Sequence, residues 1–145
     1  MKSSAFLIFT IVFVLVTIIL PAQQKDSKKP ANHRIVMQFN DPDSVSQTRT
    51  LLQVQNVRKI WPDAQIEVVC LGGGLDLLMT KNSKASNLVA EWSGKGVIFA
   101  ACNNTMINRK VTKEDLLPQA VVVPAAVIEL ATKQEEGWSY FRGGK

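Results

Sequence analysis

The chain has 145 residues and a formal net charge of +5 at neutral pH. Most of that charge lies near the N-terminus, because residues 33–145 carry 13 Lys and Arg against 11 Asp and Glu, a net of +2. No basic stripe interleaved with aromatic residues occurs, which argues against binding to nucleic acid. The length after residue 32 suits one domain with its own hydrophobic core.

The N-terminus resembles an export signal. Lys2 precedes sixteen uncharged, mostly large apolar residues, Ala5 to Leu20, and Ala22 follows shortly after. The apolar run is shorter than the ~20 residues that a membrane-spanning helix needs and is typical of a signal peptide. We expect cleavage after Ala22 and a periplasmic protein. Leu20 is larger than the small residue usual at its place before the cut, so an uncleaved membrane anchor facing the periplasm stays the alternative.

Three segments follow from this reading. Residues 1–22 are the predicted signal peptide or N-terminal anchor. Residues 23–32 are rich in lysine and too poor in apolar side chains to pack, so they are expected to form a flexible tether. Residues 33–145 are the predicted folded domain.

Apolar runs and helical periodicity alternate along the domain. The predicted strands are 35–39, 66–71, 97–101, 120–123 and 138–141. The predicted helices are 44–61, 75–79, 86–92, a stretch from 103 through 107, and one from Pro124 to near Gly137, with a capped turn at 112–115. This alternation predicts an α/β domain with a single doubly wound, mainly parallel five-stranded sheet and helices on both faces. We expect the flavodoxin-like strand order 2-1-3-4-5.

Two clusters of large apolar residues carry further expectations. Leu51, Val54, Val57 and Trp61 recur three or four residues apart, so all four are expected to pack in the core. The last strand carries Trp138, Tyr140 and Phe141, more aromatic surface than the helices of a small domain cover easily. An exposed apolar edge usually marks an interface, which predicts a homo-oligomer.

The segment 94–105, GKGVIFAACNNT, is the most informative one for function. A buried strand ends at Cys102, and the cap-forming residues Asn103, Asn104 and Thr105 follow it. Ligands of α/β sheets bind at the carboxyl ends of the strands, where helix N-termini offer unpaired N–H groups. A cysteine in that place has a pKa below the ~8.5 of a free thiol, so Cys102 is the candidate nucleophile, with the three residues after it as supporting hydrogen-bond donors or caps.

Cys70 differs from Cys102 because it lies inside an apolar strand. In the expected strand order the two cysteines stand two strand spacings apart, roughly 9–10 Å. That exceeds the ~7 Å between Cα atoms that a disulfide tolerates, so both thiols are expected to be free within one subunit. Cys70 is most simply a small buried hydrophobic residue.

The chemistry open to Cys102 is limited by its neighbours. The only histidine, His33, precedes the first strand and is expected at the opposite end of the sheet, which disfavours a Cys-His hydrolase. A thiolate without a base suits reactions in which the sulfur itself is exchanged or transferred. Gly72, Gly73 and Gly74 form either a plain tight turn or, as a weaker alternative, an anion-binding turn. We expect no metal site and no cofactor.

From about residue 34 to its end, the chain resembles the DsrE/DsrF-like family, which includes sulfur carriers of bacterial sulfur relay and sulfur oxidation. The matching segments are the first strand, LLQVQNVRKI with Asn56, VVCLGGGLDLL, GKGVIFAACNNTM, and LLPQAVVVPAAVIELATKQEEGWSYF. The resemblance implies that Cys102, which alone stands at the family's cysteine position, accepts sulfur as a persulfide. It also implies assembly into trimers or hexamers. The export signal is a departure, because the characterised relays are cytoplasmic.

Two functions are therefore expected, in this order. The first is an extracytoplasmic sulfur-binding or sulfur-transfer protein that carries sulfane sulfur on Cys102 and exchanges it with a donor or acceptor, either a protein or a small sulfur species. The alternative is a non-catalytic, oligomeric α/β binding module in which Cys102 only packs.

Overall fold

The computed structural model describes residues 32–145. The predicted signal peptide and nearly all of the predicted tether lie outside the described residues. Within residues 32–145, no helix combines the length and the apolar character that crossing a membrane requires.

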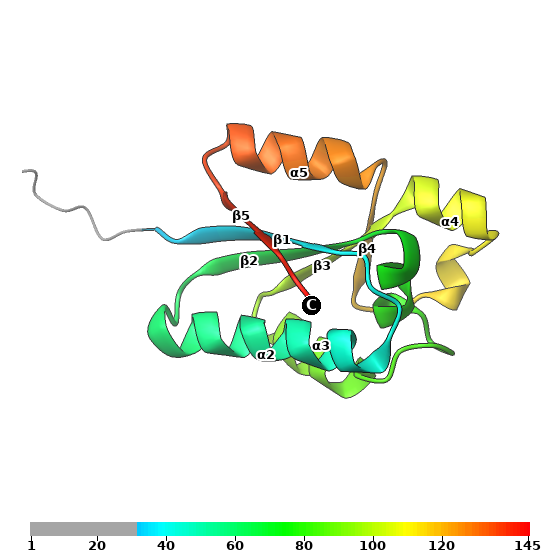
Figure 1. The fold of residues 1–145 in the computed structure, drawn as a ribbon, viewed down its shortest axis with the longest axis horizontal. Coiled ribbons are helices and arrows are strands. Elements are labelled where there is room, and N and C mark those ends of the chain that lie inside the picture. The colour runs from blue at the N-terminus through cyan, green and yellow to red at the C-terminus, as the bar shows by residue number, and fades with distance from the viewer. Residues whose placement is uncertain (1–31) are drawn as a thin grey trace, which may run out of the picture. The chain divides into compact units, whose positions relative to one another are not determined.

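The described chain alternates strands and helices, as the sequence predicts (Figure 1). The strands are β1 Arg34–Phe39, β2 Gln65–Cys70, β3 Ile98–Cys102, β4 Ala120–Val123 and β5 Ser139–Arg142. The α-helices are α2 Ser44–Ile60, α3 Ser86–Gly94, α4 Asn103–Arg109 and α5 Ala126–Glu135, and the 3-10 helices are η1 Gly72–Leu78 and η2 Lys113–Asp115. Two helix starts differ from expectation by more than one residue. The helix expected at 75–79 is the 3-10 helix η1, which begins at Gly72, and α5 begins at Ala126 and not at Pro124, because Ala125 has the extended backbone of an N-cap.

The predicted α/β class with a five-stranded parallel sheet is confirmed, but the expected strand order 2-1-3-4-5 is wrong. The order is β4-β3-β2-β1-β5, and all four pairings are parallel. Each of the first three crossovers moves one strand further in the same direction, so β2 and β3 are neighbours. The last connection, α5, runs back over the sheet and places β5 beside β1 (Figure 1).

The helices cover the two faces of the sheet unequally. Helices α2 and α3 lie on one face and α5 lies on the other (Figure 1). The larger apolar cluster accordingly joins the sheet to α2, α3 and η1, with Phe39, Leu51 and Phe99 fully buried within it. The smaller cluster lies under α5 and contains Cys102, Val36, Val69, Ala100, Ala126, Leu130 and Trp138.

The start of α2 is fixed by Asp43, whose carboxylate accepts a hydrogen bond from the Ser46 N–H at 3.0 Å. Leu51 and Val54 are buried and Val57 packs against them, as the helical spacing predicts. The expectation that Trp61 packs in the core is wrong. Trp61 is 41% exposed and stacks on His33, with the ring centroids 3.9 Å apart. The helix ends at Ile60, so Trp61 leaves the buried stripe.

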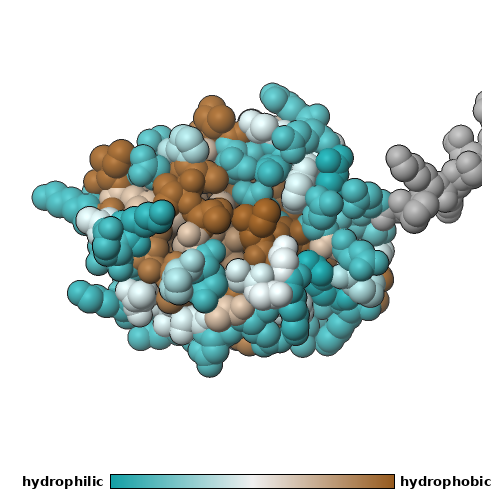
Figure 2. Space-filling view, turned by 180° about the vertical axis from the view of Figure 1, so that it is seen from behind, coloured by the Kyte–Doolittle hydropathy of each residue, from teal (hydrophilic) through white to brown (hydrophobic). Residues whose placement is uncertain are grey.

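The aromatic residues at the end of the chain divide into two groups. Tyr140 and Phe141 on edge strand β5 are 44% and 45% exposed, as expected. Trp138 is buried, contrary to expectation, because it precedes β5 and packs under α5, where the Lys133 ammonium lies 4.7 Å from the centre of its ring. The opposite edge strand, β4, exposes Val121 and Val122. The side of the molecule hidden in Figure 1 carries an apolar area near its centre (Figure 2).

Candidate functional site

The predicted site residues lie together at the carboxyl ends of the parallel strands. Cys102 is the last residue of β3, and the glycine turn follows β2 directly. His33 lies at the other end, because it precedes β1 and stacks on Trp61. The expectation that the histidine stands apart from Cys102 is therefore confirmed, so the thiol has no imidazole base.

The Cys102 sulfur takes the place of a helix cap. The N-cap residue of α5, Ala125, makes no capping hydrogen bond with its side chain. The first N–H of the helix, that of Ala126, is buried and donates to the Cys102 Sγ at 3.3 Å. A buried N–H without a partner is costly, and a thiolate accepts a hydrogen bond better than a thiol. The start of α5 thus favours the ionised form of Cys102.

Opposing effects set the acidity of Cys102. Burial, the largest single effect, raises the pKa of the thiol. Hydrogen bonds from the Ala126 N–H, from the hydroxyl and N–H of Thr105 and from the Asn104 N–H together outweigh it, so the pKa of Cys102 is lowered from its ordinary value. Of these groups, the Ala126 N–H at the start of α5 is the one that lies within hydrogen-bond distance of the sulfur, at 3.3 Å.

The three residues after Cys102 occupy the first turn of α4. Asn103 and Thr105 are half-buried and Asn104 is exposed. The supporting role expected of these three residues stays a prediction, because the side chain of Cys102, the N-cap of α4, makes no cap hydrogen bond. The Thr105 hydroxyl also accepts a hydrogen bond from the Gly72 N–H at 3.0 Å, which ties α4 to the glycine turn.

Cys70 lies on the opposite face of the sheet from Cys102. Cys70 pairs in register with Ala101, so the next residue, Cys102, points the other way. Both cysteines are free, but not for the reason expected from the sequence: their strands are adjacent, and the sheet itself separates the two side chains. Cys70 is fully buried in the larger cluster, and burial raises the pKa of its thiol far above the ordinary range.

The glycine turn has a packing explanation at two of its three positions. A Cβ on Gly74 would collide with the Phe39 carbonyl, and one on Gly73 would lie 2.9 Å from the Pro42 ring. Both glycines therefore let η1 approach the end of β1 closely. Gly72 differs, because its φ of +53° favours glycine and its N–H already donates to Thr105. An anion site at this turn stays a prediction.

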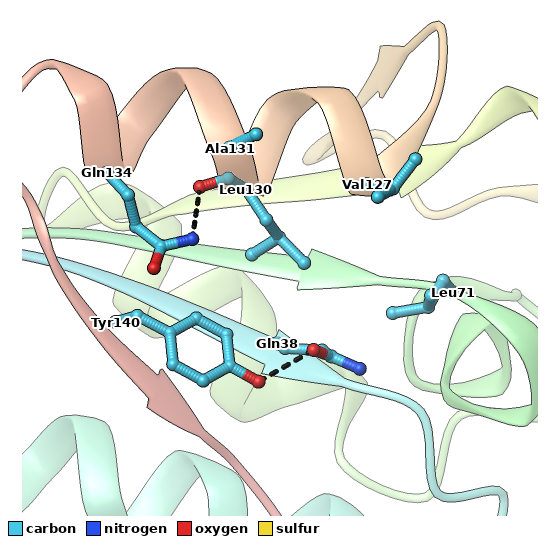
Figure 3. A pocket seen from close by; sticks show the side chains of 7 residues that line it. All are labelled: Gln38, Leu71, Val127, Leu130, Ala131, Gln134 and Tyr140. Atoms are coloured by element: carbon cyan, nitrogen blue, oxygen red, sulfur yellow. Dashed lines mark hydrogen bonds between the residues drawn. The ribbon is translucent and has the colours of Figure 1, made fainter.

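A groove of about 400 Å³ opens between α5 and the sheet (Figure 3). Leu71 and Leu130, which line it, also pack in the cluster that contains Cys102. The other lining residues are Gln38, Val127, Ala131, Gln134 and Tyr140. The Tyr140 hydroxyl donates to the Gln38 side-chain oxygen at 2.7 Å. The groove is thus apolar with uncharged polar groups, a lining typical of ligand pockets.

Sequence reasoning selected Cys102 as the candidate but missed the Ala126 N–H that donates to its sulfur and the hydrogen bond between Gly72 and Thr105. Ala126 is 24 residues away and Gly72 is 33 residues from Thr105, so no local pattern connects them. No group of three or more residues suited to binding a metal occurs among residues 32–145. The described arrangement can stabilise a thiolate, and the chemistry it supports is that of a sulfur nucleophile.

A family model and a solved structure both match most of the described domain. The family model described as DsrE/DsrF-like matches residues 33–142. MTH1491, a protein of unknown function from Methanobacterium thermoautotrophicum, is 35% identical with a TM-score of 0.66, over 76% of this chain and 98% of that one. A comparison with curated proteins gives no match.

Two further structures share the fold at lower identity. BT1422 from Bacteroides thetaiotaomicron, of unknown function, is 13% identical with a TM-score of 0.60, over 77% of this chain and 95% of that one. The ychN protein of E. coli is 12% identical with a TM-score of 0.62, over 77% of this chain and 99% of that one. These likenesses show the fold alone. The family match over most of the described domain and the 35% identity together show that this chain belongs to the DsrE/DsrF-like family.

Proposed function

We propose that this protein is a sulfur carrier in which Cys102 accepts sulfane sulfur, holds it as a persulfide and passes it to an acceptor thiol. Family membership supports a role in sulfur relay. The observation that carries the proposal is the environment of Cys102: a strand-end thiol whose sulfur accepts the first N–H of α5 and whose pKa is lowered.

The transfer balances without an added oxidant or reductant. The Cys102 thiolate attacks the outer sulfur of a donor persulfide, R–S–SH. A bond forms between Sγ and that sulfur while the bond between the two donor sulfurs breaks, and the donor leaves as the thiolate R–S⁻. Delivery is the same reaction in reverse order, with an acceptor thiolate attacking the outer sulfur on Cys102. Neither step needs a base on the protein once the attacking thiol is ionised.

The experiment is a transfer assay with mapping of the modified cysteine. Protein loaded with a small persulfide and freed of excess donor is mixed with an acceptor thiol. The expected result is loss of the added sulfur from the peptide that contains Cys102 and its appearance on the acceptor. Loading found on Cys70, or loading at Cys102 that no thiol removes, would contradict a carrier role.

A second candidate is a binding module in which Cys102 only packs. The observation in its favour is that Cys102 is just 4% exposed and belongs to an apolar cluster. In that case Cys102→Ala should cost several kcal/mol, as core substitutions do, and the folded protein should resist alkylation. The carrier predicts the reverse: rapid alkylation of Cys102 in the folded state and little loss of stability in Cys102→Ser.

We also propose that the carrier acts in the periplasm. The support is the apolar leader in residues 1–22, followed by a polar segment. N-terminal sequencing of the native protein should find a start near Gln23 in the periplasmic fraction. A retained Met1 in the membrane fraction would instead indicate the anchored alternative.

The carrier is further proposed to be a homo-oligomer, a trimer or a hexamer. Its support is apolar surface that a monomer leaves open: Tyr140 and Phe141 on the β5 edge, and Val127 and Ile128 on α5, which are 69% and 63% exposed. Light scattering should give a mass of several chains at micromolar concentration. A stable monomer in that range would contradict the assembly.

A further inference from the structure

Helix α2 buries polar side chains and exposes apolar ones. Its buried residues include Ser46, Gln47 and Thr50, which are at most 1% exposed. Three apolar residues on its outer side, Val45, Leu52 and Ile60, are 58%, 50% and 74% exposed. Leu52 follows Val45 by seven residues and Ile60 by a further eight, so they share one side of the helix. Single exposed apolar side chains are ordinary, but a stripe of them along one helix indicates a contact surface.

The same helix carries positive charge and no carboxylate. Residues 44–60 contain Arg49, Arg58 and Lys59 and no Asp or Glu. Arg49 and Lys59 are exposed, while the Arg58 guanidinium donates to the carbonyls of Pro62 and Lys95. Two cations therefore stand free among the exposed apolar side chains of α2.

The chain before the described domain joins it at the C-terminal end of α2. His33 stacks on Trp61, which directly follows the helix and is 41% exposed. Residues 23–32 add a net charge of +2, from Lys25, Lys28 and Lys29 against Asp26. These ten residues span at most ~35 Å when extended, so a leader inserted in a membrane would hold this end of α2 near the surface. Cleavage before Gln23 would leave the same lysines on the chain.

The exposed residues of this helix and the tryptophan after it form one surface, which we call the α2 outer face: Val45, Arg49, Leu52, Lys59, Ile60 and Trp61. The nearby carboxylates lie at its two ends, where Asp43 pairs with Lys145 at 3.4 Å and Asp63 follows Trp61. Apolar side chains, free cations and a tryptophan are the composition of helices that lie on anionic membranes. Helix α5 covers the other face of the sheet (Figure 1), so the assembly proposed through α5 and β5 does not use the α2 outer face.

We propose that the α2 outer face rests on a membrane surface that carries anionic lipid headgroups. Its apolar side chains enter the boundary between headgroups and acyl chains, and Arg49 and Lys59 contact the headgroups together with the lysines of residues 23–32. The helix, with 17 residues and a length of ~25 Å, lies along the surface. The inference concerns a surface other than the site of Cys102 and holds whether or not that cysteine carries sulfur.

The experiment measures binding of the chain that starts at Gln23 to lipid vesicles by co-sedimentation. Residues 32–145 form one compact unit with its own core, so this chain retains the described domain. Vesicles that contain phosphatidylglycerol are the anionic probe, and vesicles of phosphatidylcholine alone are the neutral one. Binding should be strong to the first and weak to the second, and added salt should weaken it.

Substitutions on the α2 outer face should weaken binding, with melting temperatures near that of the parent. Arg49→Gln and Lys59→Gln should each weaken it about fivefold, the effect of one cation near an anionic surface. Leu52→Gln should also weaken it about fivefold, because the half of the leucine side chain that is exposed no longer gains from leaving water. Lys113→Gln and Ile107→Gln are matched controls on η2 and α4, equally exposed but outside the face, and should bind as the parent does.

Tryptophan fluorescence identifies which side of the domain meets the lipid. Brominated acyl chains quench a tryptophan that reaches them. Trp61 is exposed on the α2 outer face, whereas Trp92 and Trp138 are each 9% exposed. Quenching should accompany binding of the parent and should be lost in Trp61→Phe, which keeps an apolar ring and still binds.

The inference is overturned if the parent binds both kinds of vesicle equally or binds neither. It is also overturned if the two control variants weaken binding as much as the α2 variants, or if Trp61→Phe leaves the quenching unchanged. Binding that the α2 variants do not alter would assign the attachment to the lysines of residues 23–32 alone. A lower assembly mass of Leu52→Gln in light scattering, with unchanged vesicle binding, would make the face a contact between copies of this chain and would equally contradict the membrane.

Discussion

Lys133 on α5 provides a test of how the helix over Cys102 is held on the sheet. Its ammonium lies 3.1 Å from Glu67 Oε2 and 3.5 Å from Glu129 Oε1, and above the Trp138 ring. Glu67 is 2% exposed in the middle of β2, so its carboxylate depends on this cation. Lys133→Met keeps most of the apolar stem and removes the charge.

We expect Lys133→Met to destabilise the domain by about 3 kcal/mol at pH 7. Removing one partner of a buried pair costs ~3–5 kcal/mol because the other charge is left uncompensated. The lower end applies here, since the Lys133 side chain is 18% exposed and water reaches that side of the pair. A loss of ~3 kcal/mol corresponds to a melting temperature lower by about 10 °C for a domain of this size.

The loss should depend on pH in a defined direction. Burial raises the pKa of Glu67 above its ordinary 4.5, and the ion pair with Lys133 opposes that rise only in part. Without Lys133 the pKa of Glu67 rises further. A folded state that holds a proton more tightly than the unfolded chain gains stability as the pH falls. The difference in free energy of unfolding between parent and variant should therefore shrink as the pH falls through the raised pKa of Glu67 toward 4.5.

Urea denaturation at pH 7 and pH 5 measures both effects, and Lys95→Met is the matched control. Lys95 also pairs with a glutamate four residues earlier, Glu91, at 2.6 Å, and lies over the ring of Trp92. Its side chain is 54% exposed, so we expect a loss below about 1 kcal/mol. Equal losses for the two variants at pH 7, or a Lys133→Met loss that is the same at both pH values, would refute the reasoning.

Three further predictions concern the frame of the site. Asp43→Ala should lower the melting temperature at pH 7, and its gap to the parent should close as the pH falls from 3.8 to about 2, because the cap hydrogen bond from Ser46 holds the pKa of Asp43 at about 2 in the folded state; Asp43→Asn, which keeps a capping oxygen, should lower it less at pH 7. Gly74→Ala should cost about 1–3 kcal/mol through collision with the Phe39 carbonyl. Gly94→Ala, with open space around the added carbon, should be neutral or stabilising in the same melting experiment. Cys70 is fully buried, so it should react with iodoacetamide only when the domain unfolds. Mass spectrometry of the treated protein measures that reaction.

The parts of the fold that sequence predicts well are those that depend on neighbours in the chain. Strand β2 is mostly apolar because five of its six residues are buried, and α2 shows its buried stripe at Leu51 and Val54. Trp61 shows the limit of this reasoning. It continues the three-to-four-residue spacing of apolar side chains, but it lies one residue past the end of α2. Periodicity indicates which residues share a face, but not where the helix stops.

The strand order was not predictable from these patterns. Nothing in the sequence of β5 indicates that it pairs with β1, which lies about 100 residues earlier. The choice depends on α5 returning across the sheet, a long-range packing outcome. The same step places Trp138 under α5 and makes β5 an edge.

The candidate site divides in the same way. The position of Cys102 follows from local signals, a buried strand that ends in residues suited to a helix start. The Ala126 N–H that donates to its sulfur comes from a segment 24 residues away. That contact helps to lower the pKa of the thiol, so local patterns indicate the candidate residue but not the donor that acts on it.

Intact-mass analysis after exposure to polysulfide tests the central claim most directly. The wild type and Cys70→Ser should each gain the mass of one or more sulfur atoms, and a reductant should remove the added mass. Cys102→Ser should gain none while keeping the fold and the melting temperature of the parent. Sulfur addition to Cys102→Ser, or a folded wild type that takes up no sulfur, would contradict the sulfur-carrier account.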